Sequence, residues 1–237
     1  MHSILSLRLV LSLTALFLAL TGSASAAVTP GASTNFITTW NTENSGTSAN
    51  NQIRIPGTGA GYNYEIYWEN TASSTQNGTT SPITTSSYTL TFPEPGIYRV
   101  EIAGAFPHIY FNSTGDRQKI LTVEQWGNIA WTSMENAFFG CSNLTIPATD
   151  APDLGGVVSM SSMFRGATSF NQPLNHWDTS AIEGMVATFQ DATAFNQPLD
   201  GWDTSSVVSM LAMFYYAPAF NQPLKETLIY YNLKYRM

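Results

Sequence analysis

Large hydrophobic residues alternate with polar residues in several short segments between residues 36 and 123. The clearest segments are residues 62–68 (YNYEIYW) and 98–102 (YRVEI), where apolar side chains occupy every second position. Because successive side chains of a β-strand point to opposite faces, this period of two predicts half-buried strands. Further short apolar segments predict strands at residues 36–40, 52–55, 88–92, 109–111 and 120–123.

Turn-forming residues separate these segments. Glycine, proline and asparagine cluster at residues 56–59, 77–78 and 93–96. Residues 71–87 are rich in serine and threonine and are expected to form a long exposed loop. About seven short strands joined by such turns, with no helical period, predict an immunoglobulin-like β-sandwich over residues 27–124.

The carboxy-terminal half follows a different pattern, a repeat of 25 residues. The pentapeptide FNQPL occurs at residues 170–174, 195–199 and 220–224, and residues 160–184 and 185–209 are identical at 13 of 25 positions. One such unit cannot enclose its own apolar side chains, so the period predicts a solenoid in which Phe stacks on Phe and Met on Met. Each repeat is expected to contain a short strand, as at residues 182–185 and 207–210, a brief helix and a turn.

The regular repeats cover residues 160–224 and have irregular neighbours on both sides. Residues 125–159 keep the Trp, Met and Phe spacing only loosely, which predicts a degenerate capping repeat. The pattern stops after Leu224, and residues 225–237 form an atypical tail. Two interpretations of this tail stay open: an improvised cap on the last repeat, or the product of a truncated or frameshifted gene.

The repeats resemble those of the BspA-like leucine-rich-repeat surface proteins of bacteria, a family that includes the mycoplasma-type lipoprotein repeats. The resemblance rests on the motif MxxMFxxAxxFNQPLxxWDTS over residues 160–224, and more loosely from residue 126 onward. It implies an exported protein with a role in attachment or protein–protein contact. The predicted fold class is therefore mixed: an N-terminal all-β immunoglobulin-like sandwich followed by an α/β leucine-rich-repeat-like solenoid.

Residues 1–26 have the features of a cleaved secretory signal. A single cation, Arg8, precedes an apolar run from Leu9 to Leu20, and Ala24-Ser25-Ala26 fits the site read by signal peptidase. The run is shorter than the roughly 20 residues needed to cross a bilayer. We therefore expect a secreted or cell-surface protein with no membrane span after removal of the signal.

Charge and cysteine content narrow the function classes. The chain of 237 residues holds 9 basic and 16 acidic residues, for a formal net charge of −7, which argues against a nucleic-acid partner. Cys141 is the single cysteine, so no disulfide can form within the chain, and it is interpreted as a small buried apolar residue.

Catalytic and metal-binding patterns are weak. The histidines His2, His108 and His176 cannot be grouped with a serine and an acid into a catalytic triad, so we predict neither enzyme activity nor a cofactor. Asp178 and Asp203 recur at equivalent positions and could in principle hold calcium. Hydrogen bonding within their own turns is the preferred interpretation, so no metal site is predicted.

A binding face is better supported, because some positions vary between repeats while the apolar positions stay constant. Arg165, Gln190 and Tyr215 form one such series, and Asp191 and Tyr216 belong to the adjacent one. These five residues are the candidate binding face, although unconstrained surface positions also vary in this way.

These features predict a secreted or cell-surface module for protein binding or adhesion, whose partner is an extracellular protein or surface ligand. Two alternatives stay open. The chain could be a self-associating structural protein of the cell envelope, or a carbohydrate-binding β-sandwich that uses Trp40, Tyr62 or Trp68.

Overall fold

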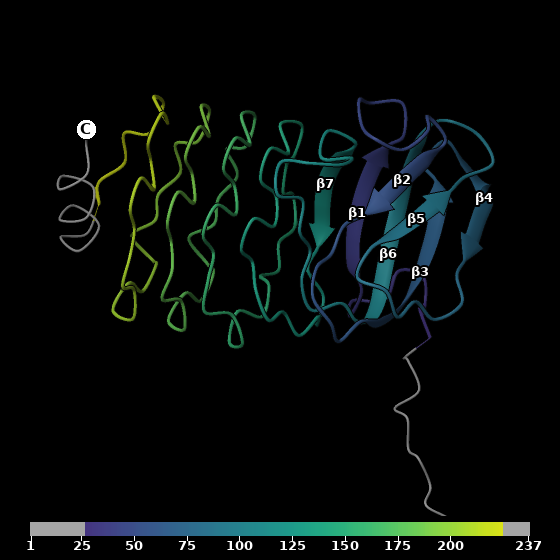
Figure 1. Ribbon diagram of the computed structural model, residues 1–237, viewed down its shortest axis with the longest axis horizontal. Helices are drawn as coiled ribbons and strands as arrows, with labels where there is room; N and C mark the ends of the chain where they lie inside the picture. The colour runs from purple at the N-terminus through teal and green to yellow at the C-terminus, as the bar shows by residue number, and fades with distance from the viewer. Residues whose placement is uncertain (1–26, 225–237) are drawn as a thin grey trace, which may run out of the picture.

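The computed structural model describes residues 27–224, so the predicted signal 1–26 and the tail 225–237 lie outside the described residues. Its regular secondary structure lies in the amino-terminal half (Figure 1). The elements are β1 (Phe36–Asn41), β2 (Gln52–Ile55), β3 (Asn63–Asn70), β4 (Ser73–Thr79), β5 (Tyr88–Thr91), β6 (Ile97–Ala105) and β7 (Ile120–Gln125). Residues 109–111, predicted as a strand, contribute an isolated bridge between Gly57 and Ile109 instead.

Strand β4 lies inside the segment that the sequence predicted as a loop. Its seven residues are serine, threonine, glutamine, asparagine and glycine, and none of them is fully buried. It lies at the edge of the larger sheet, where it pairs with β3. Because an edge strand can be held by backbone hydrogen bonds without burying apolar side chains, the hydrophobic pattern did not reveal it.

Five strands form an antiparallel sheet in the order β4-β3-β6-β1-β7, and β2 pairs with β5 in a second sheet. Strand β6 lies at the centre of the larger sheet, where Ile102 is paired with Phe36 of β1 and with Ile66 of β3. Ile53 of β2 and Leu90 of β5 belong to the same buried cluster as these three residues. The two open sheets therefore share one core.

Two buried charged residues anchor the loop between β1 and β2. The Asp116 carboxylate accepts hydrogen bonds from the backbone N–H groups of Thr47, Ser48 and Arg54. The Lys119 ammonium donates to the carbonyl oxygens of Ser48, Ala49 and Gln52. Each charge is thus matched by several polar partners, as a buried charge requires.

The predicted mixed fold class is wrong. Residues 27–224 contain strands, turns and isolated bridges but no helix, so the α/β leucine-rich-repeat-like solenoid is not formed. The amino-terminal sheets hold five and two strands, not the four and three of a constant-type immunoglobulin sandwich. The strands predicted at residues 182–185 and 207–210 are reduced to single parallel bridges that join Gly184 to Ser159 and to Ser209.

Hydrogen bonding between repeats explains why no helix forms. We call the segments 134–140, 160–166, 185–191 and 210–216 rungs. In the second rung, Met160, Ser162 and Phe164 donate their backbone N–H groups to Gly184, Val186 and Thr188 of the next repeat. Residue Ser162 also has a positive φ of 57°, and the equivalent Ala187 and Ala212 have φ of 55° and 57°. The left-handed conformation interrupts a right-handed helix, and the N–H groups that a helix would use are bonded elsewhere.

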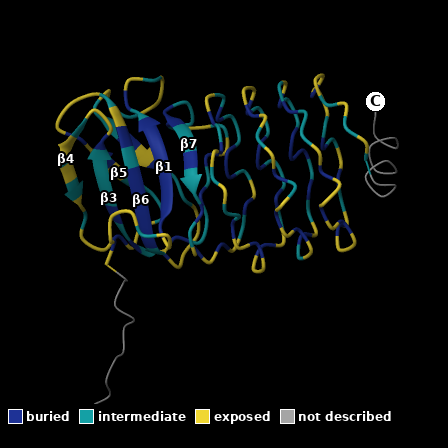
Figure 2. Cartoon of the chain, turned by 180° about the vertical axis from the view of Figure 1, so that it is seen from behind, coloured by how far each residue is buried: buried dark blue, intermediate teal, exposed yellow. Residues whose placement is uncertain are grey.

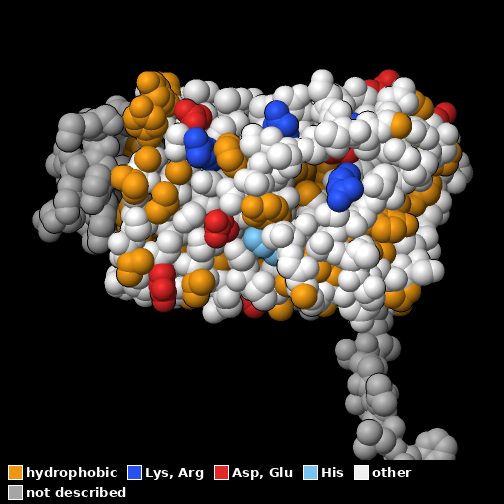
Figure 3. All heavy atoms as spheres, viewed as in Figure 1, with side chains coloured by type: hydrophobic (Ala, Val, Ile, Leu, Met, Phe, Trp, Pro, Cys, Tyr) orange, Lys and Arg blue, Asp and Glu red, His pale blue; other side chains and the backbone are white. Residues whose placement is uncertain are grey.

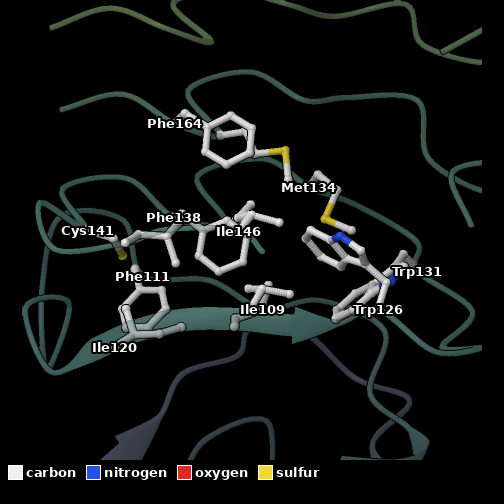
Figure 4. Close-up of a cluster of buried hydrophobic side chains, with 14 of the residues drawn as sticks. Ile109, Phe111, Ile120, Trp126, Trp131, Met134, Phe138, Cys141, Ile146 and Phe164 are labelled. Carbon is white, nitrogen blue, oxygen red and sulfur yellow. The ribbon is translucent and has the colours of Figure 1, made fainter. Parts of the chain in front are cut away.

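The phenylalanines of successive rungs stack in a column. Phe138 and Phe164 are labelled within the buried cluster of Figure 4, with ring centroids 5.9 Å apart. Phe189 continues the column at 5.7 Å from Phe164, and Phe214 lies 5.7 Å from Phe189. Each interplanar angle is small, so the rings lie nearly parallel. The 25-residue period therefore places equivalent aromatic side chains in contact.

The FNQPL motif forms a second, polar column. Asn171 Oδ1 accepts the backbone N–H of Asn196 at 2.8 Å, and Gln197 donates its side-chain amide to Asn171. The same contacts join Asn196 to Asn221 and to Gln222 one repeat later. The repeated Asn and Gln thus connect neighbouring repeats, which explains why the sequence repeats them on an exposed turn.

Buried residues run through the whole described chain in one hydrophobic cluster, from Phe36 to Met213 (Figure 2). The repeat region continues from the edge of the larger sheet, because Thr122 of β7 bridges Thr145 in parallel. No helix within residues 27–224 is long and apolar enough to cross a membrane.

Candidate functional site

The candidate binding face lies on the rungs, at positions fixed by the hydrogen bonds between repeats. Gly140 donates its N–H to Arg165 at 2.7 Å, Gly166 donates to Gln190 at 2.8 Å, and Asp191 donates to Tyr215 at 2.9 Å. Because the same bond recurs at each step, Arg165, Gln190 and Tyr215 occupy equivalent places on neighbouring rungs. The structure therefore brings the first predicted series together in one column.

The second predicted series is a column of left-handed residues. Asp191 and Tyr216 have φ of 58° and 51°, and the equivalent Gly140 and Gly166 have φ of 80° and 66°. Glycine adopts this conformation without cost, whereas a bulky side chain there is uncommon and strained. Tyr216 is therefore held in an unfavourable conformation at a position that the first two rungs fill with glycine and the third with aspartate.

Arg165 joins the two columns. Its guanidinium lies 4.9 Å from the centre of the Phe139 ring, and its Nε lies 3.9 Å from Asp191 Oδ2. That separation is too long for a hydrogen bond, and among residues 27–224 the buried Nε has no other partner. An unsatisfied buried donor is costly, but a partner can reach Arg165 only through the exposed part of its side chain, which is 36% exposed.

The two tyrosines form the exposed end of the face. Tyr215 is 41% exposed and Tyr216 is 67% exposed. Their ring centroids lie 4.3 Å apart at an interplanar angle of 69°. The hydrogen bond to Tyr216 raises the pKa of Tyr215 above its ordinary value. Figure 3 shows hydrophobic side chains gathered at the last described repeats, next to acidic and basic side chains.

We call the set of Phe139, Arg165, Gln190, Asp191, Tyr215 and Tyr216 the tyrosine ridge. Phe139 was missed by the sequence analysis, because the first repeat is offset by 26 residues and not by 25. The stacking of Phe138 on Phe164 sets this register and places Phe139 in the column of Arg165. An alignment of the repeats with one inserted residue could have found it.

Two of the three aromatic residues suggested for sugar binding are buried, and the third, Trp68, is partly buried. Trp40 is 1% exposed and Tyr62 is 5% exposed, and both lie within the core. Trp68 packs edge-on against Phe92, and the Cβ of a side chain at Gly78 would lie 2.8 Å from its ring. A sugar that stacks on an aromatic face needs an exposed ring, which Trp40 and Tyr62 do not provide.

A small cavity of about 240 Å³ lies beside the end of β2, where Arg54 and loop residues such as Thr58, Tyr110 and Asp116 line it. Asp116 lines this cavity, but its carboxylate already accepts several hydrogen bonds from the loop that it anchors. The cavity therefore offers no free carboxylate for a ligand.

The acidic and histidine candidates have structural partners. Asp178 Oδ1 accepts the N–H of Ser180, and Asp203 Oδ1 accepts the N–H of Ser205, which confirms the turn interpretation. His108 and His176 each contact a backbone carbonyl through Nε2. Within residues 27–224, no group of three or more His, Cys, Asp or Glu side chains could hold a metal ion.

Comparison with known proteins gives a match for the repeat region. Residues 132–232 match the model of a family described as "Mycoplasma protein of unknown function, DUF285". The match covers less than half of the 237-residue chain. No curated protein and no solved structure matches the chain.

Proposed function

We propose that the chain is a secreted or cell-surface module that binds another protein through the tyrosine ridge. The observation that carries the proposal is the exposed tyrosine pair, in which Tyr216 occupies a strained left-handed position. Glycine fills the equivalent position in the first two rungs, and strain of this kind is retained where the side chain has a use.

The composition of the tyrosine ridge supports a protein partner. Tyrosine and arginine are the residue types that contribute most to the energy of protein interfaces. Tyr215 and Tyr216 combine large apolar rings with hydroxyl groups, and the Arg165 side chain beside them is 36% exposed. A partner that covers the rings and brings a carbonyl or carboxylate to the exposed part of the Arg165 side chain would bury apolar area and gain a charge-assisted hydrogen bond.

Two features of the sequence support the extracellular setting. The apolar run Leu9–Leu20 with Ala24-Ser25-Ala26 has the pattern of an export signal. The repeats resemble those of BspA-like bacterial surface proteins, which act in attachment. Mass spectrometry of the protein from the culture medium tests the location, and a mature chain that begins at Ala27 is expected. Retention of the whole chain inside the cell would contradict the location.

The binding proposal is tested with immobilised purified matrix and cell-surface proteins as probes. The full chain is expected to bind at least one of them, and Tyr216→Gly should weaken that binding by about 30-fold, the loss expected of an interface hot spot. The same variant should be as stable as the wild type or slightly more stable, because glycine relieves the left-handed strain at this position.

Val208→Ser is the matched control, because Val208 is a 71% exposed apolar residue outside the tyrosine ridge. Its binding should equal that of the wild type. Wild-type binding that survives both Tyr216→Gly and Arg165→Ala would exclude the tyrosine ridge as the interface. Failure to bind any probe protein would count against the function itself.

A further inference from the structure

The last rung carries a row of backbone N–H groups that have no acceptor within residues 27–224. In each earlier rung, four alternate N–H groups donate to carbonyl oxygens of the next repeat, at distances between 2.7 and 3.1 Å. The equivalent N–H groups of the last rung meet no acceptor among the described residues 27–224; they belong to Met210, Ala212, Phe214 and Tyr216. The last rung therefore presents half of a hydrogen-bond ladder.

The apolar column also ends here within the part of the chain that the structure describes. Phe164 and Phe189 are fully buried, whereas Phe214 is only partly buried. The FNQPL phenylalanines behave in the same way, because Phe195 is buried and Phe220 is partly exposed. The hydrogen-bond ladder and the phenylalanine columns thus end at the same edge of the last rung.

We propose that this edge binds a repeat segment of the same kind from a different polypeptide. Such a segment presents carbonyl oxygens at alternate residues on one side, and a phenylalanine that continues the ring column. Successive rings in this column are 5.7 Å apart, so the partner ring is expected at that distance from Phe214. This edge shares Tyr216 with the tyrosine ridge, but it uses the backbone N–H of that residue and not its side chain. The inference does not depend on the function proposed for the ridge.

The direction of the hydrogen bonds determines the occupant. In every rung, the backbone N–H groups of this ladder donate to the following repeat, and the carbonyl oxygens accept from the preceding one. Two copies joined end to end would therefore place donors against donors. Regular β-strands are also poorly matched, because each residue of a strand directs its N–H and its C=O to the same side.

Head-to-tail pairing of two copies is disfavoured as well, because three of the four acceptor carbonyls of the first rung are already used. The Ala137 carbonyl accepts the N–H of Phe111, and the Phe139 carbonyl accepts the N–H of Ser113. The Glu135 carbonyl contacts His108 Nε2. The partner must therefore be a chain whose own acceptor row is free.

The test measures amide hydrogen exchange in the full chain, with a synthetic peptide of residues 182–201 as the probe for the partner segment. Saturating peptide should slow exchange of the four open amides at least tenfold and leave the paired amides of the preceding rung unchanged. A control peptide with serine in place of both phenylalanines should give no protection. In the protein, Phe214→Ser should weaken peptide binding at least tenfold, and Val208→Ser should not.

The same measurement without peptide distinguishes the other occupants. The four amides should exchange rapidly in the full chain at every protein concentration. Slow exchange that persists on dilution and is lost when residues 225–237 are removed would show that the tail covers the edge. Slow exchange that appears only at high concentration would show that a second copy covers it. Either result, or no effect of 1 mM peptide, would overturn the proposal.

Discussion

Replacing Phe189 with alanine removes the middle ring of the phenylalanine column. Phe189 is fully buried, and its ring lies 5.7 Å from Phe164, 4.0 Å from Phe195 and 5.7 Å from Phe214. Loss of a buried phenylalanine removes about 1.5–3 kcal/mol of transfer free energy. The cavity left between rungs raises the expected cost of Phe→Ala to about 3–5 kcal/mol.

The cost is measured as the change in unfolding free energy from urea denaturation followed by circular dichroism and tryptophan fluorescence. An unchanged slope against urea would show that the substitution altered stability and not the surface exposed on unfolding. Agreement of the two probes supports the two-state analysis that the calculation needs.

Phe214→Ala is the matched control, because the same side chain is only partly buried at the end of the column. Phe214→Ala is expected to lower the free energy of unfolding by about 2 kcal/mol. The cost is smaller because less of the Phe214 side chain is buried on folding, and no rung follows it among the described residues. The reasoning would be refuted if Phe189→Ala cost less than about 1 kcal/mol, the range of ordinary surface substitutions. It would also be refuted if both variants cost the same.

Three further predictions concern other parts of the fold. Burial alone would raise the pKa of Asp116, but hydrogen bonds from Ser48, Arg54 and Thr47 lower it below its ordinary value. The stability that this carboxylate contributes is thus complete above about pH 4 and is lost as the pH falls through the lowered pKa. Between pH 5 and pH 2, the midpoint of urea denaturation should therefore fall less in Asp116→Asn than in the wild type. Equal falls in the two proteins would contradict this account. Burial raises the pKa of the Cys141 thiol, so a thiol reagent should react with it only after denaturation, and rapid reaction of the native protein would disprove the buried position. Gly127→Ala should lower the free energy of unfolding by about 2 kcal/mol or more, because the new Cβ would lie 2.4 Å from the Asn35 carbonyl oxygen. Gly59→Ala is the control, because it has open space around the new Cβ and should cost about 1 kcal/mol. Equal losses measured by thermal denaturation would contradict the role of close packing.

The alternation of apolar and polar residues located most of the strands. Ile66 and Ile102 are buried on paired strands, as a period of two requires when one face of a sheet is covered. Strand β4 could not be found in this way, because its polar side chains carry no such pattern. Its position depends on backbone pairing with β3, which is a property of the sheet.

Part of the candidate site could be derived from the repeat period. The period places Arg165, Gln190 and Tyr215 at equivalent positions, and the structure shows them on neighbouring rungs. The strain at Tyr216 and the unsatisfied Nε of Arg165 could not be derived, because both depend on backbone angles and on distances to Asp191.

The sequence by itself determined which side chains are equivalent, since a fixed period assigns Phe164, Phe189 and Phe214 to one column whatever backbone carries them. Only the tertiary structure decided what that backbone is. A helix and a ladder between repeats compete for the same N–H groups, and the ladder is available only when a neighbouring repeat presents its carbonyl oxygens. That choice removes the predicted helices, and it also directs every free donor of the last rung toward the same end of the molecule.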